Sequence, residues 1–274
     1  KNVAGVYEGM KTIVRPTFCG RCRECLLGMP HLCSGNRRSI GIGDLPGAFS
    51  EYIKIYPQMA IEIPEGVDSQ NAALAEPFAA ALHGIRMAGT KGGSALVMGG
   101  GAIGLAVVNI LKILGFGPVA LSEPVKEKRE LGGKLGADFL VDPLTEDLAA
   151  RGRECTAGIG FETIFECSGV AGNIPQALEL AAKGGSVCMI SIIFKSVAIT
   201  QPLNMNFKEI RFTGSYSNTH DENRTCLQWM AERKIDARLI ISDRISLDVL
   251  PQTYRERIQT GKALKVMLAI GEEF

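Results

Sequence analysis

Four cysteines lie within one short stretch of the chain, in the pattern C-x2-C-x2-C-x7-C formed by Cys19, Cys22, Cys25 and Cys33. Four thiolates on a single loop are the donor set of a closed, tetrahedral structural zinc site. Such a site orders a loop that is too polar to pack by itself, because metal binding and folding are coupled. The spacing therefore predicts a structural zinc. His31 also lies in this loop, and we expect it to be exposed because four Cys ligands already complete the shell.

Two other interpretations of this loop stay open. A four-iron cluster has similar leading spacing, but its usual run has a closer fourth Cys followed by Pro, whereas Ser34 follows Cys33 here. A surface loop with free thiols is the other alternative. Clustered and scattered cysteines together argue against a disulfide framework and for reduced thiols, which predicts a cytoplasmic protein. The scattered cysteines are Cys155, Cys167, Cys188 and Cys226.

A glycine-rich turn follows the apolar run Ser94–Met98 and opens a longer apolar run, Ala102–Leu114. A dinucleotide site needs this order of strand, tight turn and helix, because the N–H groups at the helix start hold the pyrophosphate. The first glycine can make the turn, the second lets the backbone approach phosphate, and the third lets the helix sit against the strand. The candidate cofactor-binding residues of the turn are Gly99, Gly101, Ala102, Ile103 and Gly104.

An acid strengthens this interpretation, since a glycine-rich turn without a ligand is the alternative. The next apolar run, Val119–Ser122, ends at Glu123, which lies 19 residues after Gly104. This is about where a dinucleotide-binding fold places the carboxylate that binds the adenosine ribose. We therefore expect Glu123 to bind the cofactor.

Glu76 stands before Pro77, between two apolar helical stretches. The residue before a proline is driven towards an extended conformation, so we expect a kink there, with Pro77 at the first position of the next helix. A carboxylate is costly to bury without a partner, which favours a hydrogen-bonded or metal-facing Glu76 over a solvated kink. We expect His83, on that next helix, to be a satisfied helical histidine and not a ligand.

Composition limits the remaining classes. The chain has 274 residues, of which 46% are hydrophobic, so it can bury a sizeable core. Its net charge of +1 gives no reason to expect nucleic acid or an acidic membrane as a partner. The uncharged stretch Gly92–Leu111 is long enough for a transmembrane helix, but its six glycines favour a buried strand followed by a buried helix.

Strand and helix patterns alternate from Lys91 onward, which predicts a doubly wound α/β parallel sheet. The expected strands are Ser94–Met98, Val119–Ser122, Phe139–Val141, Thr163–Glu166, Ser186–Ser191 and Ile210–Thr213. The expected helices are Ala102–Leu114, Val125–Leu135, Leu144–Ala150, Ile174–Ala182 and Asp221–Arg233. Before Lys91 the chain looks β-rich, with strands expected in Lys1–Pro16 and Gly41–Ala60; after Asp236 we expect a strand, a helix at Leu247–Ile258 and a strand at Ala263–Ile270.

In this order, the four-Cys loop, Glu76-Pro77, the Gly99–Gly104 turn, Glu123 and Glu166-Cys167-Ser168-Gly169 resemble the zinc-dependent medium-chain alcohol dehydrogenase superfamily. The resemblance covers the whole chain and is closest to the threonine, sorbitol and butanediol dehydrogenase branch. It implies reversible oxidation of a secondary alcohol or polyol to a ketone with a nicotinamide cofactor, NAD being favoured by Glu123. It also implies a partial GroES-like catalytic domain, at residues 1–82 and 240–274, around a Rossmann domain at 83–239.

The resemblance further assigns roles to single residues. It implies that the four Cys hold structural zinc, that Glu76 approaches a catalytic zinc, and that Glu123 binds the cofactor ribose. Lys128 matches a basic position beside the adenine; Lys126 and Arg129 lie near it, which leaves some NADP acceptance open. The residues expected to face the nicotinamide are Cys167, Ser168, Ile190, Ser191 and Ser215, within the matching segments Cys167–Gly169, Ile190–Ile192 and Gly214-Ser215.

The chain departs from the family pattern in one respect. The family's first catalytic Cys and its Gly-His-Glu motif stand before the four-Cys loop, and no Cys, His or Gly-His-Glu precedes Cys19 here. Zinc catalysis needs about three protein ligands and an open position. We therefore expect the catalytic zinc only in an enzyme that carries that N-terminal segment, and no turnover by this chain.

Two further functions stay open. A zinc-free, quinone-reductase-like oxidoreductase is one, although the four-Cys loop and Glu76 speak against it. A non-catalytic NAD-binding protein that senses redox state through its zinc–thiolate loop is the other. The family implies a homo-oligomer, dimer or tetramer, and the apolar, proline-punctuated stretch Ile192–Met205 after the fifth strand fits an edge that pairs between subunits.

Overall fold

The computed structural model describes residues 5–43 and 45–271, and the chain divides into two compact units. The first unit combines Lys1–Glu76 with Asn218–Phe274, and the second is the continuous stretch Pro77–Ser217. The chain therefore leaves the first unit and later returns to it. The return comes before helix α9 (His220–Ala231), earlier than the expected boundary at 239/240, because α9 packs on helix α2 (Ser69–Ala72).

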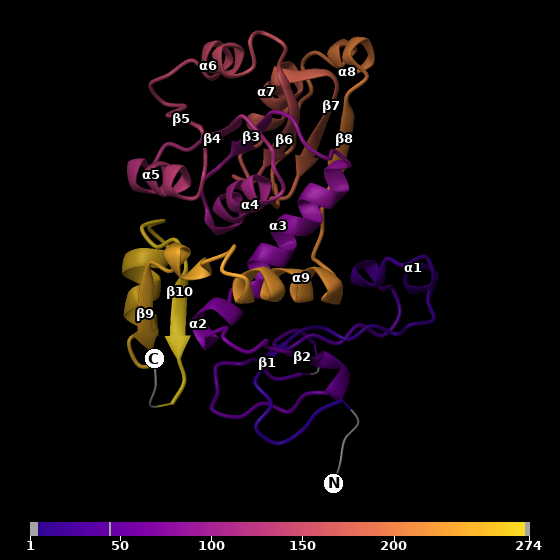
Figure 1. Ribbon diagram of the computed structural model, residues 1–274, viewed down its shortest axis with the longest axis vertical. Helices are drawn as coiled ribbons and strands as arrows, with labels where there is room; N and C mark the ends of the chain where they lie inside the picture. Colours follow the sequence, from indigo (N-terminus) through magenta and orange to yellow (C-terminus); the bar gives the residue numbers. More distant parts are fainter. Residues whose placement is uncertain (1–4, 44, 272–274) are drawn as a thin grey trace. The chain divides into compact units, whose positions relative to one another are not determined.

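The second unit is built on a six-stranded parallel sheet with the order β5-β4-β3-β6-β7-β8 (Figure 1). The strands are β3 (Ala95–Met98), β4 (Val119–Ser122), β5 (Phe139–Val141), β6 (Phe161–Glu166), β7 (Ala181–Met189) and β8 (Arg211–Gly214). β3 and β6 are neighbours in register, with Met98 opposite Glu166. The strand order reverses between these two strands, which is where ligands bind in doubly wound sheets. The predicted fold class is confirmed.

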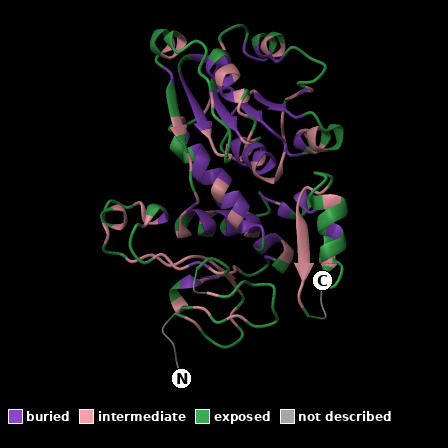
Figure 2. Ribbon diagram, turned by 180° about the vertical axis from the view of Figure 1, so that it is seen from behind, coloured by how far each residue is buried: buried purple, intermediate pink, exposed green. Residues whose placement is uncertain are grey.

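Helices cover both faces of this sheet. They are α3 (Ala75–Ala88), α4 (Ala102–Ile113), α5 (Lys126–Lys134), α6 (Leu148–Cys155), α7 (Asn173–Leu180) and α8 (Leu203–Lys208). Alternate strand residues point to opposite faces. Leu96 and Ile164 join one buried cluster with Leu148 of α6 and Leu178 of α7. The inner strands β3, β4, β6 and β7 are mostly buried, as Figure 2 shows in purple, whereas the edge strand β8 is largely exposed.

One helix begins well inside its expected range, and another has no counterpart among the expected helices. α6 begins at Leu148 and not at Leu144, because the carboxylate of Asp147 caps it by accepting the N–H of Ala149 at 2.9 Å. The residues just before it form a turn in which Asp142 donates its N–H to Glu146 at 2.7 Å. α8, which begins at Leu203 near the end of the apolar stretch Ile192–Met205, was not predicted.

The first unit contains little regular structure. β1 (Thr12–Val14) pairs antiparallel with β2 (Ala60–Glu62), and β9 (Asp243–Ser246) pairs parallel with β10 (Val266–Ala269). Its helical segments are α1 (Arg23–Leu26), η1 (Pro30–Leu32), η2 (Pro57–Met59), α2, α9, η3 (Ala237–Ile240), α10 (Leu250–Thr253) and η4 (Tyr254–Ile258).

The strands expected within Gly41–Ala60 are wrong. In the part of this stretch that the structure describes, η2 and turns replace them, and Gly41 and Gly43 adopt φ values of 73° and 80° that a strand does not allow. The N–H of Gly41 bonds to the carbonyl of Leu45 at 3.2 Å, which closes a turn. Alternating apolar residues here therefore mark a folded loop.

The kink expected between Glu76 and Pro77 is also wrong. α3 runs unbroken from Ala75 to Ala88, with Glu76 in its first turn and Pro77 at its third position. The first turn of a helix has no internal partner for its N–H groups, so proline is tolerated there.

Among the described residues, no helix is long and apolar enough to cross a membrane, and Gly92–Leu111 divides between β3 and α4.

The capping box of α9 yields a prediction. Thr219 accepts the N–H of Glu222 at 3.3 Å, and the Glu222 carboxylate accepts the N–H of Thr219 at 2.8 Å. Replacing Thr219 by Ala should lower the free energy of unfolding by about 1 kcal/mol, measured by urea denaturation. Thr225→Ala, within the same helix, removes a hydroxyl whose one hydrogen bond among the described residues goes back to the carbonyl of Asp221, and it should change stability by less than about 0.5 kcal/mol. Equal losses in the two variants would contradict the capping role.

Candidate functional site

The four cysteines of the first unit converge on one point. Their Sγ atoms all lie within 4.8 Å of one another, with Cys19–Cys25 at 4.0 Å and Cys22–Cys33 at 3.8 Å. A tetrahedron with zinc–sulfur bonds of about 2.3 Å has sulfur–sulfur edges of about 3.8 Å. The donor set and its spacing therefore fit a structural zinc ion. In the portion of the chain that the structure describes, this is the one group of three or more His, Cys, Asp or Glu ligand atoms arranged in this way.

The local backbone prepares the thiols for a cation. Hydrogen bonds from the N–H groups of Arg21 and Cys22 lower the pKa of Cys19 to about 6. Burial, followed by the neighbouring Cys22 thiol, raises the pKa of Cys25 to about 12. Adjacent thiols cannot all ionise without a positive charge among them, because each thiolate disfavours the next. A bound metal ion supplies that charge.

Two residues beside the cluster matter for its packing. A Cβ atom at Gly35 would lie 2.7 Å from the Sγ of Cys19, so only glycine leaves room for the sulfur there. His31, expected to be exposed, is buried, with only 7% of its surface accessible, and that expectation is wrong. The one-turn helix η1 directs Leu32 outwards instead, at 42% exposure.

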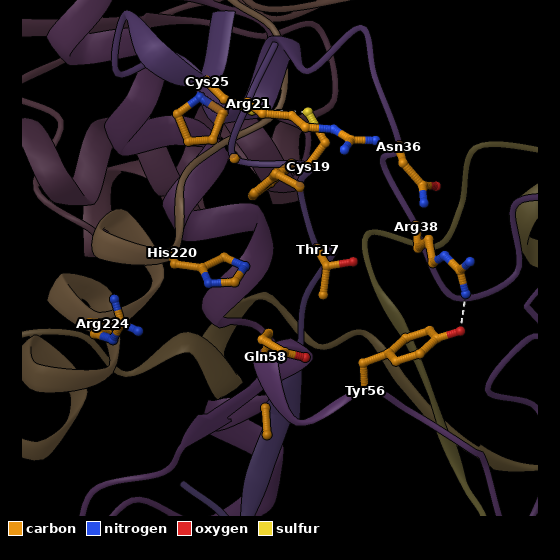
Figure 3. A pocket seen from close by; sticks show the side chains of 14 residues that line it. Thr17, Cys19, Arg21, Cys25, Asn36, Arg38, Tyr56, Gln58, His220 and Arg224 are labelled. Carbon is orange, nitrogen blue, oxygen red and sulfur yellow. Dashed lines mark hydrogen bonds between the residues drawn. The ribbon is translucent and has the colours of Figure 1, made fainter. Parts of the chain in front are cut away.

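A cleft of about 830 Å³ opens beside the cysteine cluster (Figure 3). Arg21, Arg38, Arg224 and His220 line it, and none of its described lining residues carries a carboxylate. Burial and the charges of Arg224 and Arg15 lower the pKa of His220, whose Nε2 lies 2.8 Å from the carbonyl oxygen of Pro16.

Glu76 belongs to a polar network in the first unit. Its Oε1 accepts a hydrogen bond from Nδ2 of Asn218 at 3.0 Å and lies 3.5 Å from Nη2 of Arg15. Arg15 and Asn223 both donate to Oδ1 of Asn218, at 2.8 and 2.7 Å. The side chain of Arg15 is 12% exposed and that of Glu76 45%, so the carboxylate stands at the edge of the network.

The described residues do not fit a catalytic zinc at Glu76. A catalytic site needs about three protein ligands. Glu76 is not part of any described group of three or more ligand atoms, and one of its oxygens is already bound by Asn218 and Arg15. Its role as a metal ligand therefore stays a prediction.

The glycine turn at the end of β3 is closely packed. Gly99 has a φ of 104°, and a Cβ there would lie 2.9 Å from the backbone of Ser168. A Cβ at Gly104 would lie 1.8 Å from the carbonyl oxygen of Gly99. By contrast, a Cβ at Gly101 would meet nothing within 4 Å. Gly101 is the N-cap of α4, and the N–H groups in the first turn of a helix, here those of Ala102 and Ile103, are where an anion binds.

Glu123 lies beside this turn, directly after β4. Its side chain is buried, and its two oxygens accept the N–H groups of Gly100 at 2.6 Å and Val125 at 2.8 Å. The carboxylate thus holds the glycine turn while its position at the edge of the sheet remains that of a ribose-binding acid. Lys128 is the third residue of α5, five residues after Glu123.

The residues expected near the nicotinamide lie at the ends of three adjacent strands. Cys167 and Ser168 follow β6, Ile190 and Ser191 follow β7, and Ser215 follows β8. Backbone hydrogen bonds join these ends. The N–H of Ile190 donates to the carbonyl of Glu166 at 2.9 Å, and the N–H of Ser215 donates to the carbonyl of Met189 at 2.9 Å. The structure therefore brings this whole set to the edge that carries the glycine turn.

Sequence reasoning gave no role to three polar residues, although Glu166 is part of the motif Glu166-Cys167-Ser168-Gly169. Arg15 and Asn218 hold Glu76, and the Glu166 side chain links two strand ends. Glu166 carried a signal, because an acid closes a strand that is otherwise largely apolar. Arg15 also follows a largely apolar strand, but no local sequence pattern indicates that it contacts Asn218, which is 203 positions away.

Known proteins resemble the chain in both units. The alcohol dehydrogenase GroES-like domain model matches residues 1–65, and the zinc-binding dehydrogenase model matches residues 102–232. A 2-dehydro-3-deoxy-L-galactonate 5-dehydrogenase from Pseudoalteromonas atlantica is 32% identical over all of this chain and 79% of its own length. An L-threonine 3-dehydrogenase from Caldanaerobacter subterraneus is 34% identical over 78% of this chain, which spans 61% of that relative.

A solved structure also resembles this chain over nearly its whole length. A zinc-binding dehydrogenase from Sinorhizobium meliloti, crystallised with NADP, superposes with a TM-score of 0.89 at 33% identity, covering 98% of this chain and 79% of that one. The sheet order, the paired family models and these relatives lead to one assignment. The chain belongs to the zinc-dependent medium-chain alcohol dehydrogenase superfamily.

Proposed function

We propose that this protein is a zinc-dependent, NAD-preferring oxidoreductase that oxidises a secondary alcohol, polyol or threonine-like substrate to the ketone by hydride transfer. The observation that carries the proposal is the glycine turn at the β3–β6 switch point, with Glu123 and three nicotinamide-side strand ends on the same edge. A nicotinamide cofactor supplies the hydride acceptor when bound, and the protein supplies position and electrostatics.

The roles of the chain's own residues follow from this edge. Gly101, Ala102 and Ile103 offer N–H groups to the pyrophosphate, between Gly99 and Gly104, which shape the turn. Glu123 binds the adenosine ribose and Lys128 lies beside the adenine. The nicotinamide rests against Cys167, Ser168, Ile190, Ser191 and Ser215.

The surroundings of Glu123 support NAD over NADP. An acid at this position repels the 2′-phosphate of NADP, and a nearby arginine would attract it. Arg129, the one arginine in α5, donates to the carbonyl of Glu123 at 2.6 Å and forms an ion pair with Asp142 at 3.2 Å. Its charge is therefore already balanced within the chain.

The relatives support a substrate class, and the cysteines and the exposed sheet edge support a compartment and an assembly. The two curated relatives are named as dehydrogenases of 2-dehydro-3-deoxy-L-galactonate and of L-threonine, which supports a small hydroxylated substrate. We also propose a cytoplasmic homo-oligomer, dimer or tetramer. Eight free cysteines support a reducing compartment, and the edge strand β8, with Phe212 38% exposed, supports pairing between copies.

Metal content tests the zinc assignment. The purified chain should contain about one zinc and no iron by elemental analysis, since four thiolates fill one closed shell. Cys33→Ser should lose most of the zinc, whereas Cys155→Ser, at a buried cysteine of α6, should keep it. Iron would favour the four-iron cluster, no metal would favour free thiols, and two zincs would mean that a second site forms at Glu76 after all.

Gly101 tests the pyrophosphate site. The backbone at Gly101 has a φ of −70°, which alanine adopts readily, and there is open space for a Cβ, so the Gly101→Ala variant should fold normally. Its methyl group would enter the space where phosphate approaches, and NADH affinity, measured by fluorescence, should fall about tenfold or more. Gly92→Ala, at the opposite end of β3 and also in open space, is the matched control and should bind NADH normally. Unchanged affinity in Gly101→Ala would contradict the site.

Turnover tests the catalytic assignment. Because the described residues give Glu76 no partner ligands, the 274-residue chain should bind NADH but form none from NAD with sorbitol, 2,3-butanediol or threonine. Absorbance at the NADH band measures the rate. Turnover that Glu76→Ala abolishes would show that a catalytic site exists within this chain, and the inactivity would be disproved.

A further inference from the structure

Glu166 is a fully buried carboxylate at the last position of β6. We propose that it is the positioning residue of the nicotinamide half of the site: its side chain locks the ends of β6 and β7 into the single arrangement that receives the ring. This inference rests on the proposed function, since it assumes that the carboxyl edge binds a dinucleotide. Glu166 itself stays behind the strand ends and acts through Ser168 and Ser191.

The first set of contacts shapes the turn after β6. Oε1 of Glu166 accepts the N–H of Ser168 at 2.8 Å and also the Ser168 hydroxyl. Oε2 accepts the N–H of Gly169 at 3.3 Å. The Ser168 hydroxyl in turn accepts the N–H of Val170 at 3.0 Å and a hydrogen bond from Nδ2 of Asn173 at 2.9 Å. One carboxylate therefore organises the connection from β6 into α7.

The second set of contacts reaches the neighbouring strand. Oε2 of Glu166 accepts the hydroxyl of Ser191, two residues beyond the end of β7. The backbone carbonyl of Glu166 accepts the N–H groups of Ile190 at 2.9 Å and Ser191 at 3.1 Å. Side chain and main chain of one residue thus bind both strand ends, beyond the point where the regular ladder stops.

The chemistry of these partners requires an acceptor without protons. A carboxylate offers only acceptor sites, and every described partner of the Glu166 side chain is an N–H or O–H group. No described Lys, Arg or His forms an ion pair with it, so these donors alone stabilise the buried charge. Glutamine would keep the shape but turn an NH₂ group towards donors. The carboxylate of Glu166 is therefore needed to hold the segments that follow β6 and β7 in place.

The turn that Glu166 holds lies against the glycine turn. A Cβ at Gly99 would meet the Ser168 backbone at 2.9 Å, and one at Gly104 would meet Cβ of Cys167 at 3.4 Å. A dinucleotide crosses the sheet at this point, with its second half over β6 and β7. Loosening the Glu166 contacts should disturb the nicotinamide half first, because Glu123 holds the other side of the glycine turn independently.

β6 also supplies a matched control. Glu162, near the other end of the strand, accepts the N–H of Ser94 at 2.7 Å and so joins β6 to the start of β3. It is a carboxylate on the same strand, bonded across to a neighbouring strand, but at the edge away from the glycine turn. Glu162→Gln should affect stability alone.

The test compares two ligands on the full chain by titration calorimetry. NADH and ADP-ribose differ by the nicotinamide ring. Glu166→Gln should weaken NADH by about tenfold or more, since hydrogen bonds to a charged group are lost, and ADP-ribose by less than about threefold. Ser191→Ala should weaken NADH selectively but less, and Ser191→Thr, which keeps the hydroxyl, should restore it. Glu162→Gln should leave the ratio of the two affinities unchanged.

Each other outcome is decisive. If Glu166→Gln binds NADH as the wild type does, or loses both ligands equally, the positioning role is wrong. If that variant does not fold, Ser191→Ala and Ser191→Thr decide: equal NADH affinity in both would overturn the inference. Wild-type protein that binds neither ligand would instead disprove the proposed function, on which the inference depends.

Discussion

The second unit depends on the junction of β3 with β6, where the order of the parallel strands reverses. Chain connections leave this junction in opposite directions, so the strand ends on the two sides must be held apart and yet fixed. Two buried carboxylates do this. Glu123 binds the glycine turn from the β4 side, and Glu166 binds the following turn on the β6 side. A Cβ added at Gly99 would lie 2.9 Å from Ser168, so the two turns leave no room for a side chain between them.

The first unit solves a similar problem with different chemistry. Its described strands are short, and much of it is loop, so hydrophobic burial alone orders little of it. The four thiols provide a metal shell for one loop, since a bound ion stabilises backbone that cannot pack. A second polar network joins Arg15, Glu76 and Asn218. In both units, therefore, charged or metal-binding groups order the loops that a sheet or helix would otherwise leave free.

Local pattern predicted the sheet well, and for a clear reason. Strands buried on both faces read as continuous apolar runs, and the observed β4 and β5 match their expected ranges residue for residue. The same reasoning failed at Gly41–Ala60, where apolar residues alternate but the glycine conformations close turns. It also failed at Pro77, because a proline is tolerated in the first helical turn, and the break expected there depends on where the helix begins.

The sequence by itself determined the chemistry that the chain can offer: four thiols in zinc spacing, a glycine turn after a buried strand, and an acid after the next strand. These signals are local, because each depends on residues a few positions apart. Only the tertiary structure decided how distant groups combine. Arg15 meets Asn218 across 203 positions, and the Glu166 side chain meets Ser191 across 25. Such partners are chosen by packing and strand order, which no short stretch of sequence encodes.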